Sequence, residues 1–157
     1  MRSIVVFVGV CCLALATGVG ARAAAPSQFR FTATESFTDT TSCSFPIEVN
    51  LTITHVGRAY FDNVGNFLGL TDHADIIGTD AANGITLKES DHSVEMWDSS
   101  GAHKEVGLPI HIQGVGGGLV IRDAGLLFFN PDGTLAYMHR PHPQLLGDTA
   151  SLCAAFS

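Results

Sequence analysis

Charge, and positive charge above all, is scarce in this sequence. Only 15% of the 157 residues are charged, and eight Lys and Arg stand against fifteen Asp and Glu, which makes the formal net charge −7. A protein that binds nucleic acid in general needs a basic surface, because much of its affinity comes from contacts with phosphates. The composition therefore argues against a nucleic-acid partner. At 46% apolar residues the chain is also too hydrophobic for intrinsic disorder.

Several motifs that mark a known chemistry are missing as well. There is no C-x-x-C pair for redox or zinc chemistry, no G-x-S-x-G nucleophile elbow and no calcium-binding EF-hand loop. No internal repeat is visible, which argues against a solenoid. Beyond the first 24 residues no segment shows a sustained helical period of 3.6, so a helical bundle is not expected.

The first 24 residues differ in composition from the remainder. Arg2 is followed by an apolar run over residues 3–20 and then by Ala21-Arg22-Ala23, which matches the small-residue pattern that signal peptidase recognises. We therefore expect residues 1–23 to be a signal peptide and residues 24–157 to form a single β-rich domain that is secreted. The alternative is an uncleaved signal that anchors the protein, because the apolar run is barely long enough to cross a bilayer. Cleavage removes Arg2 and Arg22 and makes the domain more acidic.

Two cysteines, Cys43 and Cys153, remain after this cleavage. Thiols in an exported protein meet an oxidising environment, where a single pair normally closes. We predict a disulfide between them. The loop that it closes spans most of the domain, so the chain-entropy model gives a stabilisation of about 4–5 kcal/mol.

Short apolar–polar alternations recur through the rest of the chain. Residues 48–54 carry Val49, Leu51 and Ile53 on one side and polar side chains on the other, which is the period of a half-buried strand. Asn83-Gly84 and the segment 130–133 contain residues that favour hairpin turns. We predict eight to ten short strands in an all-β fold, a small antiparallel β-barrel or, alternatively, a two-sheet β-sandwich. One short helix is expected over residues 149–156.

Histidines and a proline-flanked segment supply the candidate ligand-binding residues. His139, Arg140 and His142 lie among two prolines, which restrict the backbone and favour an extended segment at the mouth of a barrel. His73 stands two residues from Asp75 and so on the same side of a strand. Imidazole and guanidinium groups in such positions suit an anionic or carbonyl ligand. The spacing does not identify a metal site, a cofactor or a set of catalytic residues.

Acidic residues are assigned mainly to turns and to the solvent-facing side of strands. Asp62, Asp80 and Asp132 stand in turn-like contexts, where a carboxylate accepts backbone hydrogen bonds. Glu48 and Glu95 face solvent if the alternation of their strands is correct. No pair of inward-facing carboxylates, as in a glycosidase, is predicted.

The order of these features resembles a group of small exported proteins of unknown function from actinobacteria and similar bacteria. The resemblance is carried by Cys43-Ser44-Phe45-Pro46 near the start of the predicted domain and by Leu152-Cys153 near its end. It implies the two-cysteine bridge and the all-β fold. It implies no activity and assigns no residue a role.

Together these features predict an exported domain that binds a small-molecule ligand or a cell-surface partner without catalysing a reaction. A small barrel has an interior wide enough for side chains or for one such ligand. One alternative is a small barrel enzyme, an isomerase, cyclase or lyase that uses the mouth histidines as acid–base groups. The other is a metal-binding envelope protein.

Overall fold

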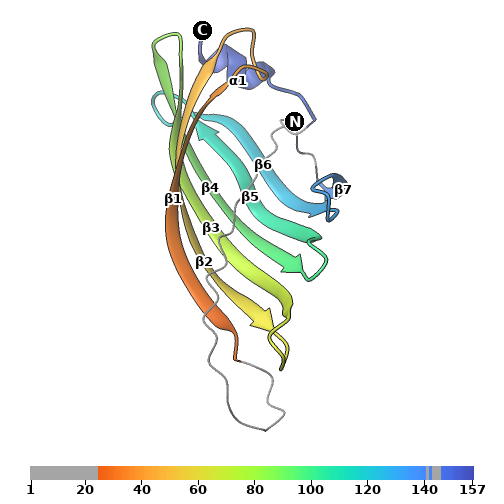
Figure 1. Ribbon diagram of the computed structural model, residues 1–157. Helices are drawn as coiled ribbons and strands as arrows, with labels where there is room; N and C mark the ends of the chain where they lie inside the picture. Colours follow the sequence, from red (N-terminus) through yellow and green to blue (C-terminus); the bar gives the residue numbers. More distant parts are fainter. Residues whose placement is uncertain (1–24, 141, 143–145) are drawn as a thin grey trace.

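A computed structural model describes residues 25–140, 142 and 146–157. It consists of a single antiparallel sheet and one short helix (Figure 1). The elements follow one another as β1 (Ser27–Asp39), β2 (Ile47–Phe61), β3 (Phe67–Ala82), β4 (Ile85–Asp98), β5 (His103–Gln113), β6 (Leu119–Phe129), β7 (Leu135–His139) and α1 (Ala150–Ala155). The all-β fold with a short helix near the C-terminus, predicted from the sequence, is confirmed.

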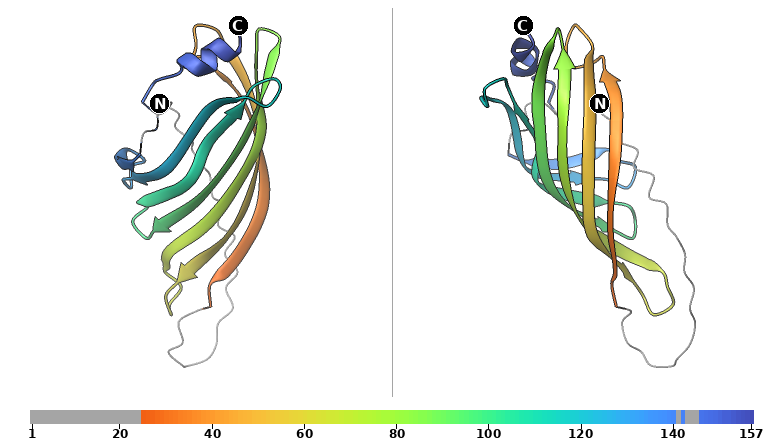
Figure 2. Two further views of the ribbon diagram at one scale, coloured as in Figure 1. Left: turned by 180° about the vertical axis from the view of Figure 1, so that it is seen from behind. Right: turned by 90° about the vertical axis from the view of Figure 1, so that its left-hand side faces the viewer.

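The strands form a meander in which each one pairs with its neighbour in sequence, in the order β1-β2-β3-β4-β5-β6-β7. The sheet is strongly curved, and its concave side carries α1 near one end (Figure 2). In the described part of the chain β1 and β7 do not pair with each other, so the sheet is open and a closed barrel is not confirmed. The two-sheet sandwich does not hold either, because these strands all belong to one sheet.

The strands are fewer and longer than predicted. β3 has 16 residues and β4 has 14, whereas the sequence suggested short strands broken by polar residues. The polar runs around Asp72-His73 and around Asp91-His92 are not breaks but strand interiors. Charged residues usually mark loops because their burial is costly. Here Asp72 and Asp91 are buried on the concave side of the sheet, and the prediction of short strands fails for that reason.

Alternating residues divide the sheet into two faces. We call the concave side the inner face and the convex side the outer face. The inner face beneath α1 holds an apolar core from four strands and two residues of the helical segment, beside the buried carboxyl residues Asp80 and Glu89. The core residues are Ile47, Val49, Leu87, Ile110, Ile112, Ile121, Leu152 and Phe156. Core burial at this end of the sheet is the main apolar contribution to folding.

The C-terminal helix is attached to the sheet at several points. Cys43 in the β1–β2 connection forms the predicted disulfide with Cys153 of α1, with Cα atoms 5.6 Å apart. Thr149 Oγ1 donates to the Ser42 carbonyl at 2.7 Å, and Asn83 Nδ2 donates to the Phe156 carbonyl at 3.2 Å. The helix is short, so these attachments and its buried side chains stabilise it more than its own hydrogen bonds do.

Two of the predicted turns are confirmed by their backbone angles. Asn83 and Gly84 join β3 and β4 with φ of 51° and 79°, the positive values that a two-residue hairpin turn of this kind requires. Gly133, in the turn between β6 and β7, has φ of 78°. The prediction that Asp80 lies in a turn is wrong, because Asp80 is buried within β3.

Irregularities in pairing accompany the curvature of the sheet. The register shifts between Glu89 and His92 along the β4–β5 pair and between Gly107 and Ile110 along the β5–β6 pair. Such shifts increase the local twist and bend a sheet. At Gly107 a Cβ atom would stand 2.4 Å from the His92 carbonyl oxygen, so no side chain fits at this close approach of two strands.

The predicted signal peptide, residues 1–23, lies outside the described residues. Where the structure does describe the chain, it contains no helix of the length and apolar character that crossing a membrane requires.

Candidate functional site

Toward the end of the sheet away from α1, the inner face carries carboxyl residues that stand opposite one another on neighbouring strands. Asp72 on β3 pairs with Glu95 on β4, and Glu95 pairs with Glu105 on β5. Residues directly opposite each other on neighbouring strands have Cβ atoms about 5 Å apart. Three carboxyl groups therefore lie in a line across three strands, and we call this set the acidic row. Carboxyl groups in such a line repel one another unless a proton or a cation offsets their charge.

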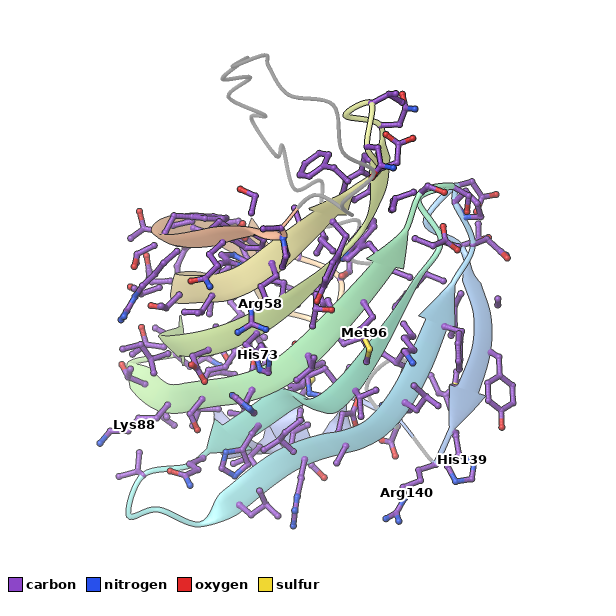
Figure 3. All side chains as sticks on the ribbon, turned by 90° about the horizontal axis from the view of Figure 1, so that it is seen from below. Arg58, His73, Lys88, Met96, His139 and Arg140 are labelled. Atoms are coloured by element: carbon purple, nitrogen blue, oxygen red, sulfur yellow. A yellow bond between two sulfur atoms is a disulfide. The ribbon has the colours of Figure 1, made fainter. Side chains whose placement is uncertain are left out.

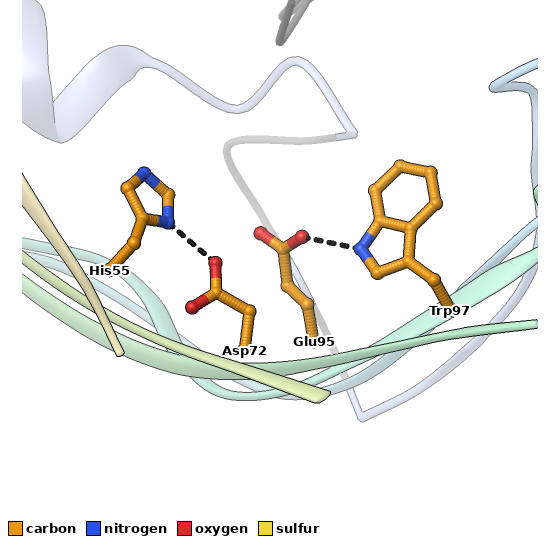
Figure 4. Close-up of polar contacts among 4 residues, drawn as sticks. All are labelled: His55, Asp72, Glu95 and Trp97. Carbon is orange, nitrogen blue, oxygen red and sulfur yellow. Dashed lines mark hydrogen bonds and ion pairs between the residues drawn. The ribbon is translucent and has the colours of Figure 1, made fainter. Parts of the chain in front are cut away.

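A buried histidine stands at the β3 end of the acidic row. The Nδ1 atom of His55 lies 2.5 Å from Asp72 Oδ2, and Figure 4 shows this contact beside Glu95 and Trp97. The exposed fraction is 8% for His55 and 6% for Asp72. The ring of Phe31 stacks on His55 with centroids 4.5 Å apart. The second carboxylate oxygen of Asp72, Oδ1, is buried and has no hydrogen-bond partner among the described residues.

Glu105 occupies the other end of the acidic row. Burial, together with the negative charge of Glu95, raises the pKa of the Glu105 carboxyl from 4.5 to about 7, and a hydrogen bond with Ser93 opposes this rise. Both physical causes disfavour the charged form of the carboxyl group. Glu105 consequently exchanges its proton near neutral pH, where an ordinary glutamate is fully ionised.

Aromatic rings adjoin the acidic row on the side away from α1. Trp97 stacks on His103 with centroids 3.7 Å apart, and His103 stacks on Phe129 at 4.5 Å. The indole Nε1 of Trp97 donates to Glu95 Oε2 at 2.9 Å. Burial lowers the pKa of His103, and the negative charge of Glu95 partly offsets this lowering. The stack thus presents a largely uncharged aromatic surface next to the carboxylates.

An open pocket of about 580 Å³ lies at this end of the sheet. Its lining includes Leu70, Trp97 and His103 of the inner face and Met96 and Lys104 of the outer face. Trp97, whose indole donates to Glu95, lines this pocket, whereas Asp72, Glu95 and Glu105 themselves do not.

The four ligand-binding residues predicted from the sequence are not brought together. His73 lies exposed on the outer face of β3 beside Arg58, whereas His139 and Arg140 lie exposed at the β7 edge (Figure 3). His142 is fully buried, and its Nε2 would stand 3.1 Å from a Cβ placed on Gly125 of β6. These residues therefore do not form one site at a barrel mouth.

The acidic row itself was missed from the sequence. Glu95 was expected to face solvent, but it shares the inner face with the buried residue Ser93. The apolar residues Val94 and Met96 on either side of Glu95 lie on the outer face. No alternation marked this face, because residues 88–93 are polar at every position.

Metal binding gains no geometric support in the described part of the chain, where no three His, Cys, Asp or Glu side chains are placed to hold one ion. Comparison of the chain with protein-family models, with curated proteins and with solved structures gives no match.

Proposed function

We propose that the protein is an exported β domain that binds a small organic ligand on its inner face, over the acidic row, without catalysing a reaction. The observation that carries this proposal is that the inner face, away from the core beneath α1, is lined by a row of three carboxyl residues beside a stack of aromatic rings. Burying carboxyl groups costs free energy that an apolar lining avoids. Their presence on this face therefore favours a role beyond folding.

Export and the barrel-like form are parts of the same proposal. The Cys43–Cys153 disulfide and the signal-like residues 1–23 support secretion, because such bonds persist in oxidising compartments. The curvature of the sheet supports a partly closed barrel, whose interior the ligand shares with side chains. We also propose that the protein is related to the small exported actinobacterial proteins that it resembles. The alternative to a small ligand is a partner on the cell surface.

The experiment begins with protein secreted by its producing cell. Native mass spectrometry of this material, before and after extraction with organic solvent, detects any co-purified small molecule. We expect an adduct that is present in the native protein and lost when Glu95→Gln and Trp97→Ala are introduced. The matched control is Glu48→Gln, because Glu48 is an exposed glutamate on the outer face of β2. Secreted protein without an adduct that also shows no saturable binding in a fragment screen by NMR would contradict the proposal.

Acid–base catalysis at the same face is the second candidate, and one observation favours it. Glu105, with a pKa of about 7, stands beside Ser93 on the same face as the His55–Asp72 pair, with Glu95 between them, so groups able to donate and accept protons share one surface. An isomerase, cyclase or lyase of this kind uses Glu105 and His55, and not His139, His142 or His73. Turnover in a substrate screen that disappears in Glu105→Gln but persists in Glu48→Gln would favour this candidate over binding alone.

A further inference from the structure

The distribution of basic residues over the sheet is strongly one-sided. Every Lys and Arg within the described strands lies on the outer face: Arg30, Arg58, Lys88, Lys104 and Arg122. Each pairs across the strands with outer-face residues, as Lys104 does with Met96. The inner face carries the acidic row without any Lys or Arg from these strands. Charge complementarity for this row must come from a proton, a histidine or a bound cation.

From this segregation we infer that the ligand of the inner face is an organic cation, a protonated or quaternary amine attached to an apolar body. The inference rests on the proposed function, since it specifies the chemistry of the ligand that this face binds. The ammonium group would lie along Asp72, Glu95 and Glu105, and the apolar body would lie against Trp97.

Two further observations support an organic cation as the ligand. The buried Asp72 Oδ1 has no hydrogen-bond partner among the described residues, so it is available to an ammonium N–H donor. The three carboxyl groups extend over three strands, and neighbouring strands lie about 4.8 Å apart. That spread is too wide for one small metal ion, in agreement with the absence of a metal-binding group in the described residues, but it suits an extended amine.

The aromatic stack provides the second half of the recognition. Trp97 offers the apolar body a large aromatic surface, and its indole is fixed by the bond to Glu95 and by stacking on His103. An anion at the same place would meet the charge of Glu95. A neutral ligand would bring no positive charge to the acidic row.

Binding of a cation beside Glu105 should release a proton that can be detected. Without a ligand, the Glu105 carboxyl retains its proton partly because of Glu95. A bound ammonium favours the ionised carboxylate, and the proton leaves to solvent. With a pKa of about 7, binding at pH 7 should release about half a proton for each cation bound.

The test uses isothermal titration calorimetry and amide chemical shifts on the disulfide-bonded domain. The probes are benzylamine and benzyltrimethylammonium, with benzyl alcohol as the neutral analogue and benzoate as the anionic one. We expect the two cations to bind at millimolar concentration, to shift amides around Asp72, Glu95 and Trp97, and to give an enthalpy that depends on the ionisation heat of the buffer.

Variants separate the contributions of the two glutamates. Glu95→Gln should weaken binding of both cations by about tenfold, as expected when one of the charges facing a cation is removed. Glu105→Gln should abolish the buffer-dependent part of the enthalpy. Glu48→Gln, on the outer face, should change neither quantity.

The outcomes also separate this inference from the proposed function. If benzyl alcohol or benzoate binds the inner face as tightly as the cations, the cationic ligand is wrong and small-molecule binding stands. If the cations bind without proton release, their ammonium group does not lie beside Glu105 and the inferred placement is wrong. If all four probes leave the inner face unperturbed at millimolar concentration and the secreted protein carries no adduct, both proposals are wrong.

Discussion

Glu95 on β4 and Glu105 on β5 stand directly opposite each other on the inner face of the sheet. Like charges at such positions destabilise a sheet, so the pair remains compatible with folding only when one member holds its proton or another charge is bound. Ser93 and Trp97 fix the two carboxyl groups by hydrogen bonds, Ser93 to Glu105 and Trp97 to Glu95. The predictions below begin with this pair.

Glu105→Gln should change how stability depends on pH. The pKa of Glu105 is raised from 4.5 to about 7 on folding, so its contribution to stability is complete below pH 4.5 and is lost as the pH rises through about 7. A shift of this size corresponds to about 3 kcal/mol. The free energy of unfolding of the variant, relative to the wild type, should rise by up to this amount between acid and mildly alkaline pH. Urea denaturation at a series of pH values measures this difference between variant and wild type. A difference that does not change with pH would refute the raised pKa of the Glu105 carboxyl.

Asp72→Asn should destabilise the protein much more than Asp75→Asn. Both aspartates lie 2.5 Å from a histidine Nδ1, Asp72 from His55 and Asp75 from His92. The first pair is buried, whereas the side chains of the second are 59% and 62% exposed for His92 and Asp75. Removing one partner of a buried pair costs about 3–5 kcal/mol, but an exposed pair contributes at most about 1 kcal/mol. Equal losses of unfolding free energy in the two variants would contradict this account of the inner face.

Replacing both cysteines by serine should lower stability without changing the β-sheet content. The disulfide joins residues 110 positions apart and attaches α1 to the β1–β2 connection. The chain-entropy model gives about 4–5 kcal/mol for a loop of this length. Chemical denaturation of the Cys43→Ser, Cys153→Ser double variant tests the value, and the far-ultraviolet circular dichroism spectrum tests the sheet. Wild type treated with a reductant should behave as the variant does, and unchanged stability in both would argue against the bridge.

Gly107→Ala should be far more damaging than Gly118→Ala. A Cβ at Gly107 would stand 2.4 Å from a backbone oxygen, whereas one at Gly118 meets no atom within 4 Å. Because the obstacle at Gly107 is backbone, the β4–β5 pair must separate locally, at a cost of about 2–4 kcal/mol. Thermal denaturation compares the two variants. Similar melting temperatures would mean that the close approach of these strands is less rigid than the geometry indicates.

The local features of the fold were predictable because their causes are local. Asn83-Gly84 forms the predicted turn, since positive φ at two successive positions suits those residues. The pairing of Cys43 with Cys153 followed from their being the only cysteines left in the predicted domain. Alternation in β2 identified Val49 and Ile53 as buried.

The candidate site was not predictable in the same way. Alternation identifies the two faces of a strand but not which of them turns inward, and β4 has polar residues on its buried side. His73 and His139 drew attention as chemically capable residues, yet the sheet places both on its exposed outer surface. Glu105 became significant only through its position opposite Glu95, on a different strand.

The sequence by itself thus determined the class of structure: an antiparallel β protein with its turns, its disulfide and a short terminal helix. These follow from backbone preferences and from the chemistry of single residues or of one pair. Only the tertiary structure decided that the sheet curves without closing and that three carboxyl groups from β3, β4 and β5 form one row. The physical reason is that register and curvature come from all the strands together, and they alone determine which side chains share a surface and whose charge alters whose pKa.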